Sequence, residues 1–241
     1  MRSTTFRSTV CGVALLVAVT TDAKAQQTAT DIATMNSWAE TAKKTEVGNQ
    51  LISVFTSTNA ILKSTPHHKR ALYLRGYLYG TIGCTTSAIA DLSKLIETDP
   101  SYAAAYTERG ICYMDQKNFE KARQDFDRAI QLNPLSGDAH LARGKLLLEM
   151  DRPTSALSDL ASCKQLAFAP ALPGELPANY YGAPDYYLGA AYEAMGRPES
   201  AAKYYKTSIK PPRLGGSGYI HRFSDQPLDA KYRLSLTEGP Q

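Results

Sequence analysis

Long apolar runs are absent from the 241-residue sequence. The longest, Val10–Val19, has ten residues, whereas a helix that crosses a bilayer needs about 20. Basic residues precede this run and Ala23-Lys24-Ala25 follows it, which is the pattern of a secretory signal peptide cleaved after Ala25. We therefore predict export to a periplasm or to the cell exterior. Once residues 1–25 are removed, we expect no stable membrane insertion.

A strong excess of one charge is also absent. The chain has 27 Lys and Arg residues and 23 Asp and Glu residues. Removing residues 1–25 takes away three basic groups and one acidic group, so the mature charge is 24 minus 22, or +2. Basic residues are interspersed with acidic ones instead of forming clusters. The sequence therefore predicts no binding of nucleic acid and no attraction to an anionic membrane.

Cysteine is scarce. Residues 26–241 contain only Cys84, Cys112 and Cys163, an odd number that allows at most one internal pair. Cys84 and Cys112 are the best placed of the three to form it. The other interpretation is that all three are small, buried packing residues. We favour packing, because sequence spacing cannot establish the close approach that a disulfide requires.

Catalytic and cofactor-binding motifs are missing as well. The sequence has no H-E-x-x-H and no G-x-S-x-G, and the glycines of residues 215–218 are followed by Tyr219 where a phosphate-binding loop has lysine. His67 and His68 have no neighbouring set of Cys, His or acidic residues, so they are expected to be solvated. We therefore predict no enzyme activity, no cofactor and no metal site.

The sequence does contain a repeat. Residues 102–134 hold a complete helix–turn–helix unit, with small and apolar residues at helical spacing on both sides of a polar turn at residues 115–118. Neither half can bury its apolar face alone. The proline that closes this unit, Pro134, has equivalents 34 residues earlier at Pro100 and again at Pro66. A period of this size indicates a solenoid.

Four units share one pattern, a glycine in the first predicted helix and an alanine in the second: Gly76 and Ala88, Gly110 and Ala122, Gly144 and Ala156, Gly189 and Ala201. This pattern resembles the tetratricopeptide repeat (TPR) family. The resemblance implies an all-α fold, an α-α superhelical solenoid of tetratricopeptide repeats at about residues 69–102, 103–136, 137–169 and 183–210. Glycine costs a helix about 1 kcal/mol relative to alanine, so we expect close packing across the hairpin, glycine against alanine, to compensate.

The segments around these repeats differ from them. Residues 26–66 are predicted to form a helical pair, at 31–44 and 49–63, that is a degenerate repeat or an N-terminal cap. Four prolines exclude a continuous helix through the insert at residues 170–184. Residues 211–241 are predicted to form a flexible linker and a short capping segment at 229–236, with a disordered end.

An arginine precedes the repeat glycine in three units, and an aspartate follows that arginine sixteen residues later: Arg75 and Asp91, Arg109 and Asp125, Arg143 and Asp159. The fourth unit loses both residues together, with Leu188 and Tyr204 instead. Joint presence and joint absence predict an ion pair between the two helices of each unit. The alternative is a ladder of ligand-binding arginines. We favour pairing, because a charge beside a packed glycine needs a partner.

In TPR proteins the first helices line a concave groove. The resemblance places the partner-binding groove residues of this chain at nine positions: Tyr73, Tyr77, Thr107, Ile111, Met114, Leu141, Lys145, Leu148 and Tyr186. About a third of them are expected to pack against neighbouring helices instead. Chaperone-binding members use basic and asparagine residues to clamp a terminal carboxylate, and this sequence departs from that clamp at each position: Tyr73, Tyr77, Glu108, Asp138 and Ala142.

We therefore predict an exported adaptor that holds a protein or peptide partner in an apolar, aromatic groove, with a role in assembling cell-envelope proteins by analogy only. Tyr77 and Ile111 are the predicted anchors of the partner. His140 stands at an aromatic position of its repeat and is predicted to be a packing residue. Two alternatives stay open: a homo-oligomeric structural subunit that self-associates through its end repeats, and an enzyme with an unrecognised site in the 170–184 loop.

Overall fold

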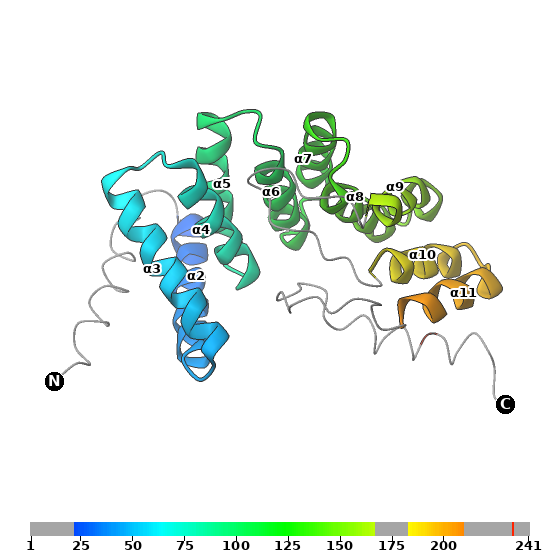
Figure 1. Ribbon diagram of the computed structural model, residues 1–241, viewed down its shortest axis with the longest axis horizontal. Helices are drawn as coiled ribbons and strands as arrows, with labels where there is room; N and C mark the ends of the chain where they lie inside the picture. Colours follow the sequence, from blue (N-terminus) through cyan, green and yellow to red (C-terminus); the bar gives the residue numbers. More distant parts are fainter. Residues whose placement is uncertain (1–21, 167–182, 210–232, 234–241) are drawn as a thin grey trace. The chain divides into compact units, whose positions relative to one another are not determined.

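A computed structural model describes residues 22–166, 183–209 and Arg233 (Figure 1). These residues form ten α-helices and no β-strand, as the sequence predicts. Most of the predicted signal peptide, the insert up to residue 182, and the linker and capping segment apart from Arg233 lie outside the described residues. The chain divides into two compact units, residues 1–99 and 100–241, which we call the N-terminal and C-terminal units.

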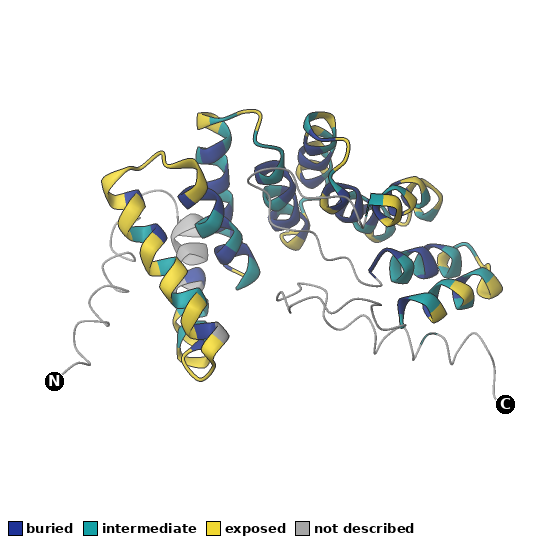
Figure 2. Ribbon diagram, in the orientation of Figure 1, coloured by how far each residue is buried: buried dark blue, intermediate teal, exposed yellow. Residues whose placement is uncertain are grey.

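The N-terminal unit contains four helices, each in contact with the next along the chain, and its first helix also touches its last. Helix α2 begins upstream of the predicted helix 31–44 and includes the predicted cleavage position, Ala25. Much of α3 is exposed (Figure 2). Its exposed residues include Val54 and Ile61. The helices are α2 (Asp22–Ala42), α3 (Glu46–Ser64), α4 (Lys69–Thr81) and α5 (Thr85–Thr98).

Helix α2 is joined to α5 by a buried aspartate. Asp31, only 2% exposed, accepts hydrogen bonds at Oδ2 from the backbone N (3.0 Å) and the Oγ (2.9 Å) of Ser87 in the first turn of α5. The residue at the start of α5, Cys84, has no capping side-chain bond of its own, and its thiol instead donates to the backbone oxygen of Asp31 at 3.2 Å. The carboxylate of Asp31, which lies on α2, therefore stabilises the N-terminus of α5.

The C-terminal unit is a series of three helix pairs. The pairs are joined by contacts of α7 with α8 and of α9 with α10. Pro153 and Pro198 begin the second helices of their pairs, as predicted, where a missing N–H costs no helical hydrogen bond. The helices are α6 (Ala103–Asp115), α7 (Phe119–Leu132), α8 (Gly137–Glu149), α9 (Pro153–Leu166), α10 (Ala183–Ala194) and α11 (Pro198–Ser208).

The repeat glycines pack against large side chains, which corrects the predicted packing of glycine against alanine. A Cβ placed on Gly110 would lie 2.6 Å from the ring of Phe126, a distance that real Cβ atoms do not show. Gly76, Gly144 and Gly189 meet Leu92, Leu160 and Tyr205 at 2.6 to 2.8 Å in the same way. The four repeat alanines are completely buried, but the glycine is required by the large residue four positions after each alanine.

The three predicted arginine–aspartate pairs are confirmed, and each is bidentate. In the first, Arg75 donates from Nε to Asp91 Oδ2 at 2.6 Å and from Nη2 to Oδ1 at 2.7 Å. The same two bonds are 2.8 Å each between Arg109 and Asp125, and 2.7 Å each between Arg143 and Asp159. The three carboxylate side chains are at most 11% exposed. Each is therefore a nearly buried negative charge that needs its arginine to balance it.

Two of these arginines also reach the preceding helix pair. Nη1 of Arg143 donates to Asp127 Oδ1 of α7 at 2.8 Å, and Nη1 of Arg75 donates to Asn59 Oδ1 of α3 at 2.8 Å. Both acceptors lie sixteen residues before their arginine. One guanidinium therefore connects the two helices of its own pair and ties that pair to the one before.

All three described cysteines are free and buried, which confirms the packing interpretation. Burial raises the pKa of Cys84 to about 12, with a further contribution from Asp31. Burial also raises the pKa of Cys163. The thiols of Cys84 and Cys163 therefore stay protonated at neutral pH and are poor nucleophiles.

Replacing Arg109 by leucine tests the ion pairs. Arg109→Leu is expected to destabilise the protein by about 3 kcal/mol, because it leaves the Asp125 carboxylate buried without its cation. Adding Asp125→Leu should recover part of that loss. Urea unfolding of the two single variants and the double variant measures the coupling.

The exposed Arg128 of the same unit provides the control for that cycle, since Arg128→Leu should change stability by no more than about 0.5 kcal/mol. If the losses of Arg109→Leu and Asp125→Leu simply add, the two side chains do not stabilise each other.

Candidate functional site

The first helices of the three pairs in the C-terminal unit form a continuous surface. Helix α8 contacts both α6 and α10, so these three helices lie side by side. Each of them contains both buried and partly exposed residues (Figure 2). Seven of the nine predicted groove positions lie on these helices, and the other two, Tyr73 and Tyr77, lie on α4 of the N-terminal unit.

Five of the nine predicted groove residues are buried, more than the third that was expected: Tyr73, Thr107, Ile111, Met114 and Leu141. Ile111 and Met114 pack with Phe126 and Leu146 in one core cluster. Ile111 was predicted to anchor a partner, and this choice is wrong because only 9% of the residue is exposed. A side chain so placed supports the helix packing and has little surface to offer a ligand.

Four of the predicted groove residues keep part of their surface exposed: Tyr77, Lys145, Leu148 and Tyr186. Leu148 packs at the edge of the core cluster that contains Leu141 and Leu160, and Tyr186 packs at the edge of a second cluster formed by Ala201 and Tyr205. The C-terminal unit therefore presents two partly exposed apolar side chains and one lysine on adjacent helices. We call Lys145, Leu148 and Tyr186 the α8–α10 surface.

Sequence reasoning missed Glu193 of α10. This residue follows its repeat glycine by four positions, as Met114 and Leu148 do in theirs, so repeat position could have identified it. Its carboxylate Oε2 accepts a hydrogen bond from the hydroxyl of Tyr205 at 2.6 Å and another from Nη1 of Arg233 at 2.7 Å. Glu193 therefore adds a carboxylate to the end of the α8–α10 surface.

His140 is buried as predicted, and it also makes two polar contacts. Its Nδ1 lies 2.9 Å from Asp159 Oδ1, and its Nε2 lies 3.1 Å from the carbonyl oxygen of Pro134. Tyr106, the equivalent residue one repeat earlier, donates to the carbonyl of Pro100 at 3.2 Å. Burial opposes the ionised form of Asp159, but hydrogen bonds from His140 and Arg143 outweigh it and lower the pKa of this carboxyl. The histidine belongs to the helix packing.

Little in the described residues suggests a metal or catalytic centre. They contain no group of three or more His, Cys, Asp or Glu residues that could hold a metal ion. His68 caps α4 by accepting the backbone N–H of Ala71 at Nδ1, and His67 lies 3.4 Å from the hydroxyl of Thr98. No helix within the described ranges is both long and apolar enough to cross a membrane.

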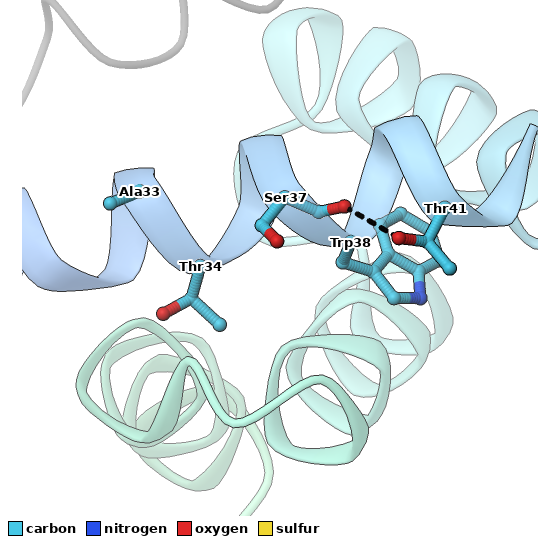
Figure 3. Close-up of a pocket in the computed structure, with 5 residues that line it drawn as sticks. All are labelled: Ala33, Thr34, Ser37, Trp38 and Thr41. Atoms are coloured by element: carbon cyan, nitrogen blue, oxygen red, sulfur yellow. Dashed lines mark hydrogen bonds between the residues drawn. The ribbon is translucent and has the colours of Figure 1, made fainter.

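A hollow of about 570 Å³ lies along α2 (Figure 3). Its lining comes from this one helix and includes no charged side chain: Ala33, Thr34, Ser37, Trp38 and Thr41. The hydroxyl of Thr41 donates to the carbonyl of Ser37 at 3.1 Å, so it is engaged within the helix. The hollow therefore offers no arrangement of acid, base or nucleophile.

Curated proteins that match the chain share only part of its length. DnaJ homolog subfamily C member 3 of Bos taurus is 28% identical over 122 residues, which is 50% of this chain and 24% of that protein. The mitochondrial import receptor subunit TOM70 of Homo sapiens is 33% identical over 100 residues, 40% of this chain and 16% of that protein. The chain thus spans a quarter or less of the length of these relatives.

Solved structures match over most of the chain. MamA has a TM-score of 0.55 at 23% identity, with 70% of this chain and 92% of that chain covered. TTC0263, a TPR protein of Thermus thermophilus, has a TM-score of 0.60 at 16% identity, with 83% and 98% covered. YrrB has a TM-score of 0.53 at 18% identity, with 75% and 81% covered. These likenesses establish the fold.

Family models described as "Tetratricopeptide repeat" match three segments, residues 69–102, 103–134 and 185–210. Each segment is a helix pair with the glycine contact described above, formed by α4 and α5, by α6 and α7, and by α10 and α11. The all-helical fold of the TPR solenoid class is therefore confirmed. The chain belongs to the tetratricopeptide repeat family.

Proposed function

We propose that this TPR protein is a protein-binding scaffold whose α8–α10 surface holds a peptide or protein partner. The observation that carries the proposal is the partial exposure of Leu148 and Tyr186 on adjacent first helices, together with that of Lys145. A partly exposed apolar and aromatic surface with a few polar groups is the kind that binds other proteins.

The relatives support a binding role. TOM70 is named an import receptor subunit, and YrrB is described as a TPR protein with an unusual peptide-binding site. Because the identities are low or the shared length is short, these descriptions support binding as a class and do not identify a partner. Neither the sequence nor the family points to a cofactor.

Export is a further part of the proposal, with the periplasm or the cell exterior as its destination and a role in assembling envelope proteins. It rests on the N-terminal sequence pattern alone. Cleavage after Ala25 would shorten α2 but leave Asp31, the residue that joins α2 to α5. The intact mass of the protein recovered outside the cytoplasm tests this, since the mature chain should begin at Gln26 and an uncleaved chain would contradict export by this route.

The α8–α10 surface is tested by replacing its apolar anchors. The double variant Leu148→Ala, Tyr186→Ala should reduce the amount of protein partner captured from cells by at least tenfold, equivalent to about 1.4 kcal/mol. Moderate salt should reduce capture only slightly, because the contact is chiefly apolar. Quantitative mass spectrometry of the captured proteins measures the change, and circular dichroism checks that the helices remain.

The matched control removes two exposed apolar side chains elsewhere, with Val54→Ala and Ile61→Ala on α3. Lys145→Glu is a second test variant, because it changes the same surface without removing a core side chain. Undiminished capture by both surface variants would place the binding site elsewhere. Loss of capture in the control variant instead would move the site to α3.

A further inference from the structure

The fourth repeat differs from the others by two polar substitutions that meet in space. Where the other repeats pack Leu92, Phe126 or Leu160 onto their glycine, this one has Tyr205. Where they have Gly80, Met114 or Leu148, it has Glu193. The Tyr205 hydroxyl lies 2.6 Å from Glu193 Oε2, so the two substitutions form one hydrogen-bonded pair.

This pair presents a carboxylate in a fixed position. The Tyr205 residue is fully buried, which holds its ring in place. Burial and the hydrogen bond to Glu193 raise the pKa of Tyr205, so its hydroxyl remains a proton donor at neutral pH. Glu193 itself keeps 33% of its side chain exposed. The core thus orients one carboxylate oxygen while the group stays open to a second donor.

A guanidinium already occupies that second position. Nη1 of Arg233 lies 2.7 Å from the same Oε2, in a charge-assisted hydrogen bond. The two side chains are 37% and 33% exposed, and an ion pair with this exposure contributes little to stability. The contact can therefore be exchanged for a similar one without disturbing the fold.

An aromatic ring packs against Tyr205 on the same face of α10 as Glu193. Tyr186 lies two helical turns before Glu193 on the same face of α10, with Ala190 between them, and its ring centroid is 5.8 Å from that of Tyr205. Arginine favours such a combination, because its planar guanidinium can stack on an aromatic face while it donates to a carboxylate. Lysine has no planar group to stack, so we expect arginine to be the better ligand.

We propose that Glu193, oriented by Tyr205, is a binding site for an arginine side chain of the partner, with Tyr186 on the same helix face, and that Arg233 fills this site in the free chain. The inference rests on the proposed function, because it assigns a chemistry to the partner of the same surface. A partner binds by bringing an arginine that displaces Arg233.

A peptide with the sequence of residues 226–241, labelled with fluorescein, tests the site by anisotropy. The receptor is the whole chain with Arg233→Gln, which removes the internal competitor. The peptide should bind this receptor at least fivefold more tightly than it binds the natural chain, whose tethered arginine competes at high effective concentration. Replacing the peptide arginine by glutamine should weaken binding at least fivefold, and replacing it by lysine should also weaken it.

Glu193→Gln in the same receptor should weaken the arginine peptide at least fivefold while still accepting the Tyr205 hydrogen bond. Glu199→Gln, which removes an exposed charge from the same repeat, is the matched control and should leave binding unchanged. Equal binding of the arginine and glutamine peptides, or an equal effect of the two glutamate variants, would overturn the proposal. Because no cellular partner is used, this result is independent of the capture experiment on Leu148 and Tyr186.

Discussion

The structure depends on partly buried arginines whose charge is satisfied by carboxylates from other helices. Arg143 is the fullest example, since it holds Asp159 of α9 with two hydrogen bonds and Asp127 of α7 with a third. Each repeat glycine lets a large side chain of the second helix approach closely, as Phe126 approaches Gly110. The arginine beside that glycine must then be paired within the packed helices. The glycine that lets the two helices approach and the arginine that pairs them are therefore adjacent in the sequence.

Features that recur at a fixed spacing were predictable from the sequence. The offset of sixteen residues predicted the ion pair of Arg109 with Asp125, because both partners keep their chemistry in three repeats. The bond from Arg75 to Asn59 was not predictable in this way, because the acceptor sixteen residues before the arginine changes identity. The burial of Ile111 was missed for a different reason, since a groove position at the edge of a helix face can turn toward a neighbouring helix, which spacing along one helix does not reveal.

The fourth repeat lacks the arginine–aspartate pair and has a different charged contact, between Glu193 and Arg233. Leu188 and Tyr204 replace the arginine and the aspartate, and the ring of Tyr204 stacks on that of Tyr192 with centroids 5.3 Å apart. The charged contact of this repeat has moved to Glu193, whose arginine comes from outside the helix pair. In the other repeats the arginine and its carboxylate are both mostly buried, whereas here both are more than 30% exposed. The three arginine–aspartate pairs stabilise the fold, whereas the more exposed pair of Glu193 and Arg233 is suited to exchange of one arginine for another.

The arginine side chains themselves provide the most direct test of whether the three arginine–aspartate pairs stay fixed while Arg233 is displaced from Glu193. In nuclear magnetic resonance spectra of the natural chain labelled with ¹⁵N, the guanidinium signals of Arg75, Arg109 and Arg143 should stay in place when the unlabelled arginine peptide is added. The signal of Arg233, assigned by its loss in Arg233→Gln, should shift as the peptide saturates Glu193. An Arg233 signal that stays unchanged while the peptide binds would show that Glu193 is not the site of exchange.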